Sequence, residues 1–169
     1  IEPLDAARIL LKLVERELGP HHVSCDIGCH LFSILPPFNI GASTMGYGLG
    51  ASSASAFAAG AQLGASKKAV AFMGDGGFWH NGLLTGVQAA LFNGDDAVLL
   101  IMKNGYTSAT GTQDILSTPE APHGAEADPR LSRAHLDQSI EATLKGMGVK
   151  WLRTVESYDV DAMRRTLEE

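Results

Sequence analysis

Asp75 stands among three glycines where an apolar stretch ends, in the segment VAFMGDGGFWHNG at residues 70–82. Glycines at such a point let backbone N–H groups approach a phosphate closely, and the start of the helix that follows adds a favourable potential. The sequence offers the Asp75 carboxylate no obvious structural partner, and a phosphate beside it would be repelled unless a cation lay between them. Because Mg²⁺ prefers hard oxygen ligands and substrate phosphates, Asp75 is a candidate ligand of Mg²⁺ that bridges a diphosphate.

A second polar residue, Asn104, follows the apolar stretch DAVLLIM at residues 96–102. If this stretch and the one before Asp75 are parallel strands, their carboxyl ends meet at one edge of the sheet, where the ligands of open α/β sheets bind. We therefore expect Asn104 to lie beside Asp75. A purely structural interpretation stays open, in which residues 74–77 form a tight turn and Asn104-Gly105 a type I′ turn.

The composition restricts the class of protein. With 169 residues and 45% apolar residues, the chain predicts one domain over residues 1–169 with a sizeable core. A net charge of −6 argues against a nucleic-acid partner, and no apolar run is long enough to predict a membrane span. Two cysteines give no disulfide framework, which favours a reducing, cytoplasmic location. Because the chain begins at Ile1, we expect it to be part of a longer polypeptide.

Helical and strand patterns alternate along the chain, which predicts an α/β fold around a parallel sheet. Helices are expected over residues 3–18, 46–63, 81–92 and 135–146 and after a cap at Asp159, and strands over residues 22–25, 67–73, 96–102 and 150–155. The strand at 96–102 is expected to be buried on both faces, because its residues after the first are all apolar. Residues 112–133 show little periodicity and predict a long loop.

Four sequence blocks resemble the thiamin diphosphate-binding domain of the indolepyruvate ferredoxin oxidoreductase alpha subunit, in the 2-oxoacid:ferredoxin oxidoreductase superfamily. They are CDIGCHLFSILPPFN, STMGYGLG, GDGGFWHNG and NGYTSATGTQD, in that order within residues 22–115. The last two match the thiamin diphosphate motif, which opens with GDG and closes with an asparagine; here Asp75 and Asn104 are 29 positions apart. The resemblance implies a three-layer thiamin diphosphate-binding fold with a mostly parallel central sheet.

The resemblance also implies roles for individual residues. Asp75, the Asn104 side chain and the Tyr106 backbone carbonyl would hold Mg²⁺. The backbone amides of Gly76 and Gly77 would cradle the diphosphate. Further cofactor contacts are implied for residues of the same blocks, namely Asp26, Gly28, Cys29, Thr44, Met45, Gly74, Thr107 and Ser108.

Three of the residues in these blocks have two interpretations each. Met45 would lie under the cofactor and force it into a V shape, or it is a core methionine, since methionine often fills irregular core gaps. His80 and His30 are candidate catalytic residues, because histidine titrates near neutrality and could reach the reacting carbon or the substrate carboxylate. Both histidines could equally be structural.

The segment HHVSCDIGCH at residues 21–30 invites a metal interpretation. Cys25 and Cys29 have a spacing found in structural zinc sites, although no second pair of ligands follows. Cys29 could alternatively ligate an iron–sulfur cluster together with cysteines from outside this chain. A packed or cofactor-adjacent thiol is the third interpretation, in keeping with the burial of free cysteines.

The resemblance implies oxidative decarboxylation of an aryl 2-oxo acid, such as indolepyruvate, to an acyl-CoA, with electrons passing through iron–sulfur clusters to ferredoxin. The chain has no Cys-x-x-Cys-x-x-Cys run, so the clusters would lie elsewhere. The implied partners are a pyrimidine-binding domain that supplies an activating glutamate, a gamma/beta-type subunit and ferredoxin, in an oligomer. Two alternatives stay open: a non-oxidative decarboxylase subunit of the sulfopyruvate type, and a non-catalytic module that binds the cofactor.

Overall fold

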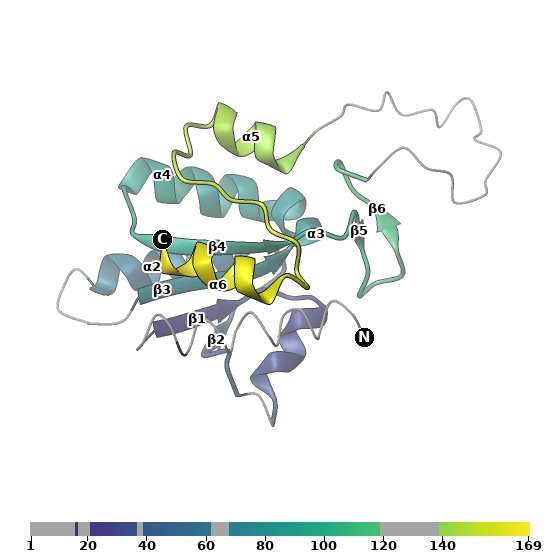
Figure 1. The fold of residues 1–169 in the computed structure, drawn as a ribbon, viewed down its shortest axis with the longest axis horizontal. Coiled ribbons are helices and arrows are strands. Elements are labelled where there is room, and N and C mark those ends of the chain that lie inside the picture. Colours follow the sequence, from purple (N-terminus) through teal and green to yellow (C-terminus); the bar gives the residue numbers. More distant parts are fainter. Residues whose placement is uncertain (1–15, 17–20, 37–38, 62–67, 119–138) are drawn as a thin grey trace.

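The structure, a computed structural model, describes residues 16, 21–36, 39–61, 68–118 and 139–169 (Figure 1). The helix expected over residues 3–18 and residues 119–133 of the expected loop lie outside these ranges, apart from residue 16, which is helical. The elements in chain order are β1 His21–Cys25, the 3₁₀-helix η1 Cys29–Ile34, β2 Ser43–Thr44, α2 Gly50–Ala61, β3 Lys68–Gly74, α3 Asp75–Gly77, the π-helix η2 Phe78–Gln88, α4 Ala89–Asn93, β4 Ala97–Met102, β5 Tyr106–Thr107, β6 Gln113–Asp114, α5 Ile140–Gly146 and α6 Val160–Glu168.

The main sheet is parallel, as the sequence predicts. Its strand order is β2-β1-β3-β4, and each neighbouring pair runs in the same direction. The register places Val23 opposite Val70, and Val70 opposite Val98. A separate antiparallel pair joins β5 to β6, so the loop expected from residue 112 begins with a short strand. The α/β fold is therefore confirmed.

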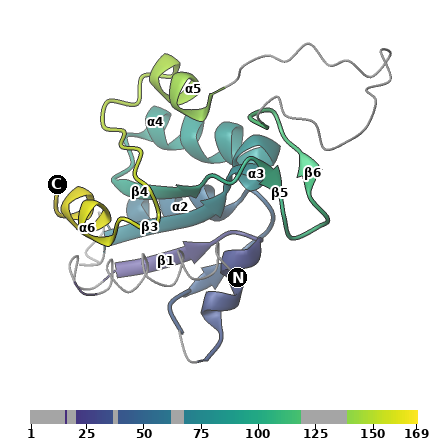
Figure 2. The same cartoon turned by 45° about the vertical axis from the view of Figure 1, so that its right-hand side comes forward.

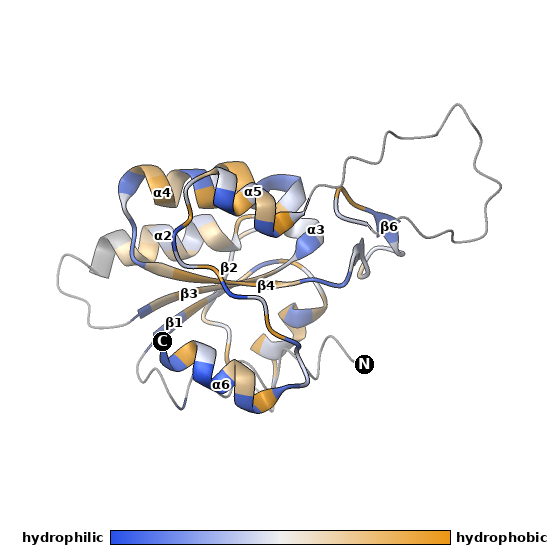
Figure 3. Cartoon of the chain, turned by 45° about the horizontal axis from the view of Figure 1, so that its top comes forward, coloured by the Kyte–Doolittle hydropathy of each residue, from blue (hydrophilic) through white to orange (hydrophobic). Residues whose placement is uncertain are grey.

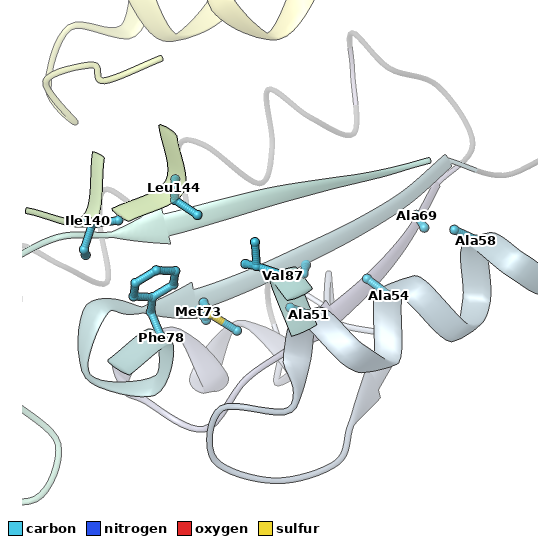
Figure 4. Packing of buried hydrophobic residues seen from close by; sticks show 10 residues of the cluster. Ala51, Ala54, Ala58, Ala69, Met73, Phe78, Val87, Ile140 and Leu144 are labelled. Atoms are coloured by element: carbon cyan, nitrogen blue, oxygen red, sulfur yellow. The ribbon is translucent and has the colours of Figure 1, made fainter. Parts of the chain in front are cut away.

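Helices cover both faces of this sheet (Figures 2 and 3). On one face α2, η2 and α5 pack against β3 in a core cluster, drawn in Figure 4, of Ala51, Ala54, Ala58, Ala69, Ala71, Met73, Phe78, Val87, Ile140 and Leu144. On the other face η1 and α6 contribute Leu31, Ile34 and Leu167 to a cluster centred on Val23, Cys25, Val70 and Phe72. Alternate residues of β3 thus face opposite layers, which is the three-layer arrangement expected of the fold.

Small residues allow the closest helix contact. A Cβ added to Gly86 of η2 would collide with the Cβ of Ala51 on α2. The Ala-, Gly- and Ser-rich helix was expected over residues 46–63 and extends over Gly50–Ala61. Glycine and alanine at the contact bring η2 close to α2, and η2 begins beside the candidate site.

The helix expected to begin at residue 81 begins at Asp75 instead. The chain is helical without a break through α3, η2 and α4, because Gly77 takes right-handed helical angles of φ −63° and ψ −38°. It ends where Gly94 adopts the left-handed conformation, with φ 68°. The glycines of the motif therefore form the first turn of a helix rather than a loop ahead of one.

Two expectations about the C-terminal third of the chain are wrong. Residues 150–155 form no strand, and β4 is half-buried along its whole length rather than buried on both faces. Both errors concern the outer side of β4, which is the edge of the sheet among the described strands. Residues 149 and 151–158 instead line, together with β4 and α5, a groove of about 880 Å³.

The last two helices, α5 and α6, each begin with a side chain that caps the helix N-terminus. Ser139 accepts a hydrogen bond from the Ala142 N–H at the start of α5, and Asp159 accepts one from Ala162 at the start of α6. The Asp159 cap is confirmed; the first residues of the helix expected at 135–146 lie outside the described ranges. Within those ranges, no helix has both the length and the apolar character to cross a membrane.

Candidate functional site

The predicted site residues gather where the parallel strands end. Figure 1 shows α3 and β5 beyond the arrowheads of the sheet. Asp26, Asp75 and Asn104 come shortly after the ends of β1, β3 and β4, so they lie at this edge. Thr44 is the last residue of β2, and Met45 follows it at the same edge. Ligands of open α/β sheets bind at such an edge, because loops from several strands meet there.

Asp75 is buried, with 1% of its surface exposed, and its carboxylate is held by backbone amides. Oδ2 accepts hydrogen bonds from the N–H groups of Gly105 at 2.7 Å and Asn104 at 3.0 Å, and Oδ1 accepts one from Gly76 at 2.9 Å. The expectation that this carboxylate has no structural partner is wrong. Burial raises its pKa, while hydrogen bonds from Gly105, Asn104 and Gly76 act in the opposite direction.

These hydrogen bonds place Asn104 directly beside Asp75, as the strand ends predict. The Asn104 side-chain oxygen is itself oriented, because it accepts a hydrogen bond of 3.2 Å from the Tyr106 N–H. A carboxylate, an amide oxygen and the backbone at Tyr106 thus come together at the end of β4. Oxygen donors of this kind suit Mg²⁺.

Gly76 and Gly77 have no room for a side chain. A Cβ at Gly76 would lie 2.5 Å from the Tyr47 hydroxyl and 2.6 Å from the Thr107 hydroxyl. A Cβ at Gly77 would collide with Oδ2 of Asp26. Gly74 differs, since nothing lies within 4 Å of the position of its Cβ. The two glycines after Asp75 therefore allow Tyr47, Thr107 and Asp26 to pack closely against the backbone, whereas Gly74 is not sterically required.

Asp26 is fully buried and joins two loops of the site. Its Oδ1 accepts a hydrogen bond of 3.2 Å from Leu49 N–H, while its Oδ2 has no hydrogen-bond partner among the described residues. Desolvation raises its pKa, against the effect of backbone hydrogen bonds from residues 27 and 48–50. Asp26 lies between the loop before α2 and the turn at Gly77.

The residues that follow Asp26 differ in burial: His30 lies in the interior, whereas Gly28 and Cys29 are partly exposed. Gly28 has extended backbone angles, and the Cys29 sulfur lies 3.3 Å from the Ser108 hydroxyl, which joins two sequence blocks at the site. His30 points inward: it is 1% exposed, its ring packs against Phe72 at 5.1 Å, and burial lowers its pKa to about 4. A neutral, enclosed His30 differs from the substrate-facing residue that the sequence suggested.

The three remaining predicted residues are at the surface. Thr44 is exposed, and Met45 is 70% exposed, which excludes a core methionine within the described structure. His80 is exposed on η2, and its ring lies 4.8 Å from the ring of Tyr47. Tyr47 was missed by the sequence analysis, although it lies in the block STMGYGLG, because no chemistry follows from its spacing alone.

The metal interpretation of residues 21–30 finds no support. Within the part of the chain that the structure describes, no group of three or more His, Cys, Asp or Glu residues could hold a metal ion. His22 contacts the Ser43 hydroxyl at 3.0 Å instead, and both cysteines are free thiols. Cys25 is buried and its pKa is raised by desolvation, so it is a packed thiol.

Comparison with known proteins identifies the family. Residues 26–169 match the family model described as "Thiamine pyrophosphate enzyme, C-terminal TPP binding domain". The chain belongs to this family of thiamin diphosphate-binding domains.

Its relatives include proteins named indolepyruvate oxidoreductase subunit IorA, so the resemblance seen in the sequence is confirmed. The protein of Pyrococcus horikoshii is 29% identical over 154 residues, 85% of this chain and 22% of that protein. The protein of Archaeoglobus fulgidus is 30% identical over 171 residues, 98% of this chain and 25% of that protein. This chain therefore spans about a quarter of the length of these relatives. No solved structure matches the chain significantly.

The residues at the sheet edge fit the diphosphate end of the cofactor named by the family. Gly76 and Gly77, which have no room for a Cβ, lie at the start of a long helix, where the helix N-terminus favours an anion. Asp75 and Asn104 lie next to each other at this edge, because the Asn104 backbone N–H donates to Asp75 Oδ2. The arrangement can hold an anion together with a cation; Asp26 and His30 are enclosed, and His80 is the exposed histidine at the edge.

Proposed function

We propose that this chain binds the diphosphate of thiamin diphosphate together with Mg²⁺, in an enzyme that oxidatively decarboxylates an aryl 2-oxo acid to an acyl-CoA. The observation that carries the proposal is the hydrogen bond from the Asn104 N–H to Asp75 Oδ2, at 3.0 Å, beside the crowded Gly76. In this proposal Asp75, the Asn104 side chain and the Tyr106 carbonyl hold the metal. When bound, the cofactor supplies the electron sink for decarboxylation.

In this proposal the described residues position the diphosphate of the cofactor and its metal. Asp75 and Asn104 coordinate the metal, and the amides of Gly76 and Gly77 face the phosphates. In this proposal Met45, 70% exposed at the end of β2, supports the reactive end of the cofactor, and His80 is the surface residue that approaches the substrate carboxylate. In this proposal His30 is an enclosed, neutral side chain that does not contact the substrate, because it is 1% exposed.

Further parts of the enzyme belong to the proposal. The relatives are named as oxidoreductase subunits, which supports partner subunits and an oligomer for this protein as well. We expect a pyrimidine-binding domain to supply the activating glutamate. We also expect iron–sulfur clusters outside the described residues to pass electrons to cytoplasmic ferredoxin, and CoA to accept the acyl group.

The test measures binding and turnover separately in the complete protein. Calorimetry with thiamin diphosphate should show binding that requires Mg²⁺. Indolepyruvate should then release carbon dioxide only with CoA and an oxidised ferredoxin present, and the ferredoxin should become reduced. Release of an aldehyde without ferredoxin reduction would instead support the non-oxidative decarboxylase. Binding without any turnover would support the non-catalytic module.

A further inference from the structure

Tyr47 connects its own loop to two elements of the site that are distant from it in sequence, η2 and β5. Its ring packs at 4.8 Å against the ring of His80 on η2, at an interplanar angle of 39°. Its hydroxyl lies 3.5 Å from the hydroxyl of Thr107 on β5, which is 60 residues away along the chain. The side chain therefore reaches from the loop between β2 and α2 across the first turn of the long helix.

The oxygen atoms of both hydroxyl groups lie close to Gly76. A Cβ on Gly76 would lie 2.5 Å from the Tyr47 oxygen and 2.6 Å from the Thr107 oxygen, so the two oxygens lie close to one backbone position. The same glycine donates its N–H to Asp75 Oδ1 at 2.9 Å. Two hydroxyls, a glycine backbone and the candidate metal ligand thus surround one small region.

The two hydroxyls satisfy each other poorly. Their separation of 3.5 Å is at the outer limit of a hydrogen bond, whereas hydroxyl pairs usually lie at about 2.7–2.8 Å. Among the described residues this long contact is the one hydrogen bond that either hydroxyl makes. Each hydroxyl carries one donor and can rotate it, so an anionic oxygen near both would receive two hydrogen bonds.

We propose that Tyr47 and Thr107 form a hydroxyl pair that donates two hydrogen bonds to one phosphate group of a bound diphosphate, next to Gly76. This inference rests on the proposed function and adds a specific phosphate subsite to it. The pair selects for a phosphate, because its donors match an oxygen anion. Thiamin without a phosphate would gain nothing from them.

A purely structural role for the pair makes a different prediction. If the Tyr47 hydroxyl only fastens its loop to β5, removing it lowers the stability of the protein and weakens all ligands equally. If it binds phosphate, its removal weakens only ligands that carry the diphosphate. Hydrogen bonds to charged groups are stronger than neutral ones, so the loss should be measurable for a single hydroxyl.

The experiment compares Tyr47→Phe, Thr107→Val and Thr107→Ser with the wild type in the complete protein. Tyr158→Phe is the matched control, because it removes a tyrosine hydroxyl from a residue that is 61% exposed outside the site. Calorimetry in the presence of Mg²⁺ measures the affinity for inorganic pyrophosphate, thiamin diphosphate and thiamin. Thermal unfolding without ligand measures stability.

Tyr47→Phe and Thr107→Val should each weaken pyrophosphate and thiamin diphosphate by about tenfold or more, with thiamin affinity and the melting temperature unchanged. Thr107→Ser and Tyr158→Phe should bind as the wild type does. Undiminished pyrophosphate affinity in Tyr47→Phe overturns the hydroxyl pair and leaves the proposed function standing. An equal loss for thiamin, or a loss that follows the melting temperature, overturns the pair in favour of a structural contact. A wild type that binds neither diphosphate overturns the proposed function and the pair together.

Discussion

The Oδ2 atom of Asp75 accepts a hydrogen bond of 2.7 Å from the backbone N–H of Gly105, across 30 residues of chain. This bond fastens the end of β3 to the chain that leaves β4, so the candidate metal ligand is also a structural residue. Any substitution at this position therefore changes two properties, and the two must be measured separately.

Asp75→Asn should abolish Mg²⁺-dependent cofactor binding at moderate cost in stability. The amide keeps one oxygen that can accept from the Gly105 N–H but loses the charge that attracts the metal. Asp75→Ala should in addition lower the free energy of unfolding by about 1–3 kcal/mol, because it leaves buried amides unpaired. Calorimetry and urea unfolding make the two measurements, with Asp161→Asn on the exposed side of α6 as the control. Cofactor affinity that survives in Asp75→Asn would contradict the metal assignment.

Asn104→Ala should weaken binding and leave the fold almost unchanged. The backbone N–H of Asn104, which reaches Asp75 at 3.0 Å, remains in the variant. The side-chain oxygen is lost, and metal affinity should fall by at least about 10- to 100-fold, the range found even for residues behind the direct ligands. Titration with Mg²⁺ at saturating thiamin diphosphate measures the loss. If the melting temperature falls while metal affinity stays, the residue is only part of a turn.

Gly77→Ala should destabilise the protein by about 1–3 kcal/mol, because the new methyl group would collide with the fully buried Asp26 carboxylate. Gly146→Ala is the matched control: it adds the same methyl group at the end of α5, where nothing lies within 4 Å. There the substitution should be neutral, or stabilising by up to about 1 kcal/mol, from its helix propensity. Urea unfolding of the two variants tests the difference, and equal stabilities would show that Asp26 can move aside.

Stability should fall as the pH is lowered from about 6.5 to about 4 through the contribution of His30. Burial lowers the pKa of His30 in the folded state, so over this window the unfolded chain binds the proton more strongly than the folded chain. The contribution is fully present above the unfolded pKa and amounts to at most about 3 kcal/mol. Asp26 and Asp75, whose pKa values are raised, act in the opposite direction.

His30→Phe isolates this contribution. The difference in unfolding free energy between the wild type and this variant should change with pH between about 6.5 and 4, while the effects of the two aspartates cancel. Urea unfolding at a series of pH values measures it. A difference that is independent of pH would mean that the pKa of His30 is the same in the folded and unfolded states.

The strands β1, β3 and β4 and the edge where the site lies could be predicted because they depend on local pattern. An apolar run followed by Gly74 and Asp75 indicates a strand end, and parallel pairing then places Asn104 beside it. The contact between Tyr47 and Thr107 could not be predicted, since it joins a short block to a strand of two residues by side chains alone. Nor could the absence of a strand at residues 150–155, whose pattern suits a strand but whose pairing depends on tertiary packing.

The helical start at Asp75 also escaped prediction for a physical reason. Glycine has low helix propensity, so Gly76 and Gly77 favour a loop when they are considered locally. The structure satisfies the Asp75 carboxylate with amides from another strand end, and the helix begins around that anchored residue.

The outer edge of β4 is a surface to which another polypeptide chain could bind. Its outward N–H and C=O groups belong to an apolar strand that is half-buried and has no ladder on that side among the described residues. Such an edge is a template for another extended backbone. Amide hydrogens that point outward from β4 should therefore exchange with deuterium faster than those directed at β3, alternating from one residue to the next. An extended peptide that adds to this edge would slow the fast set alone.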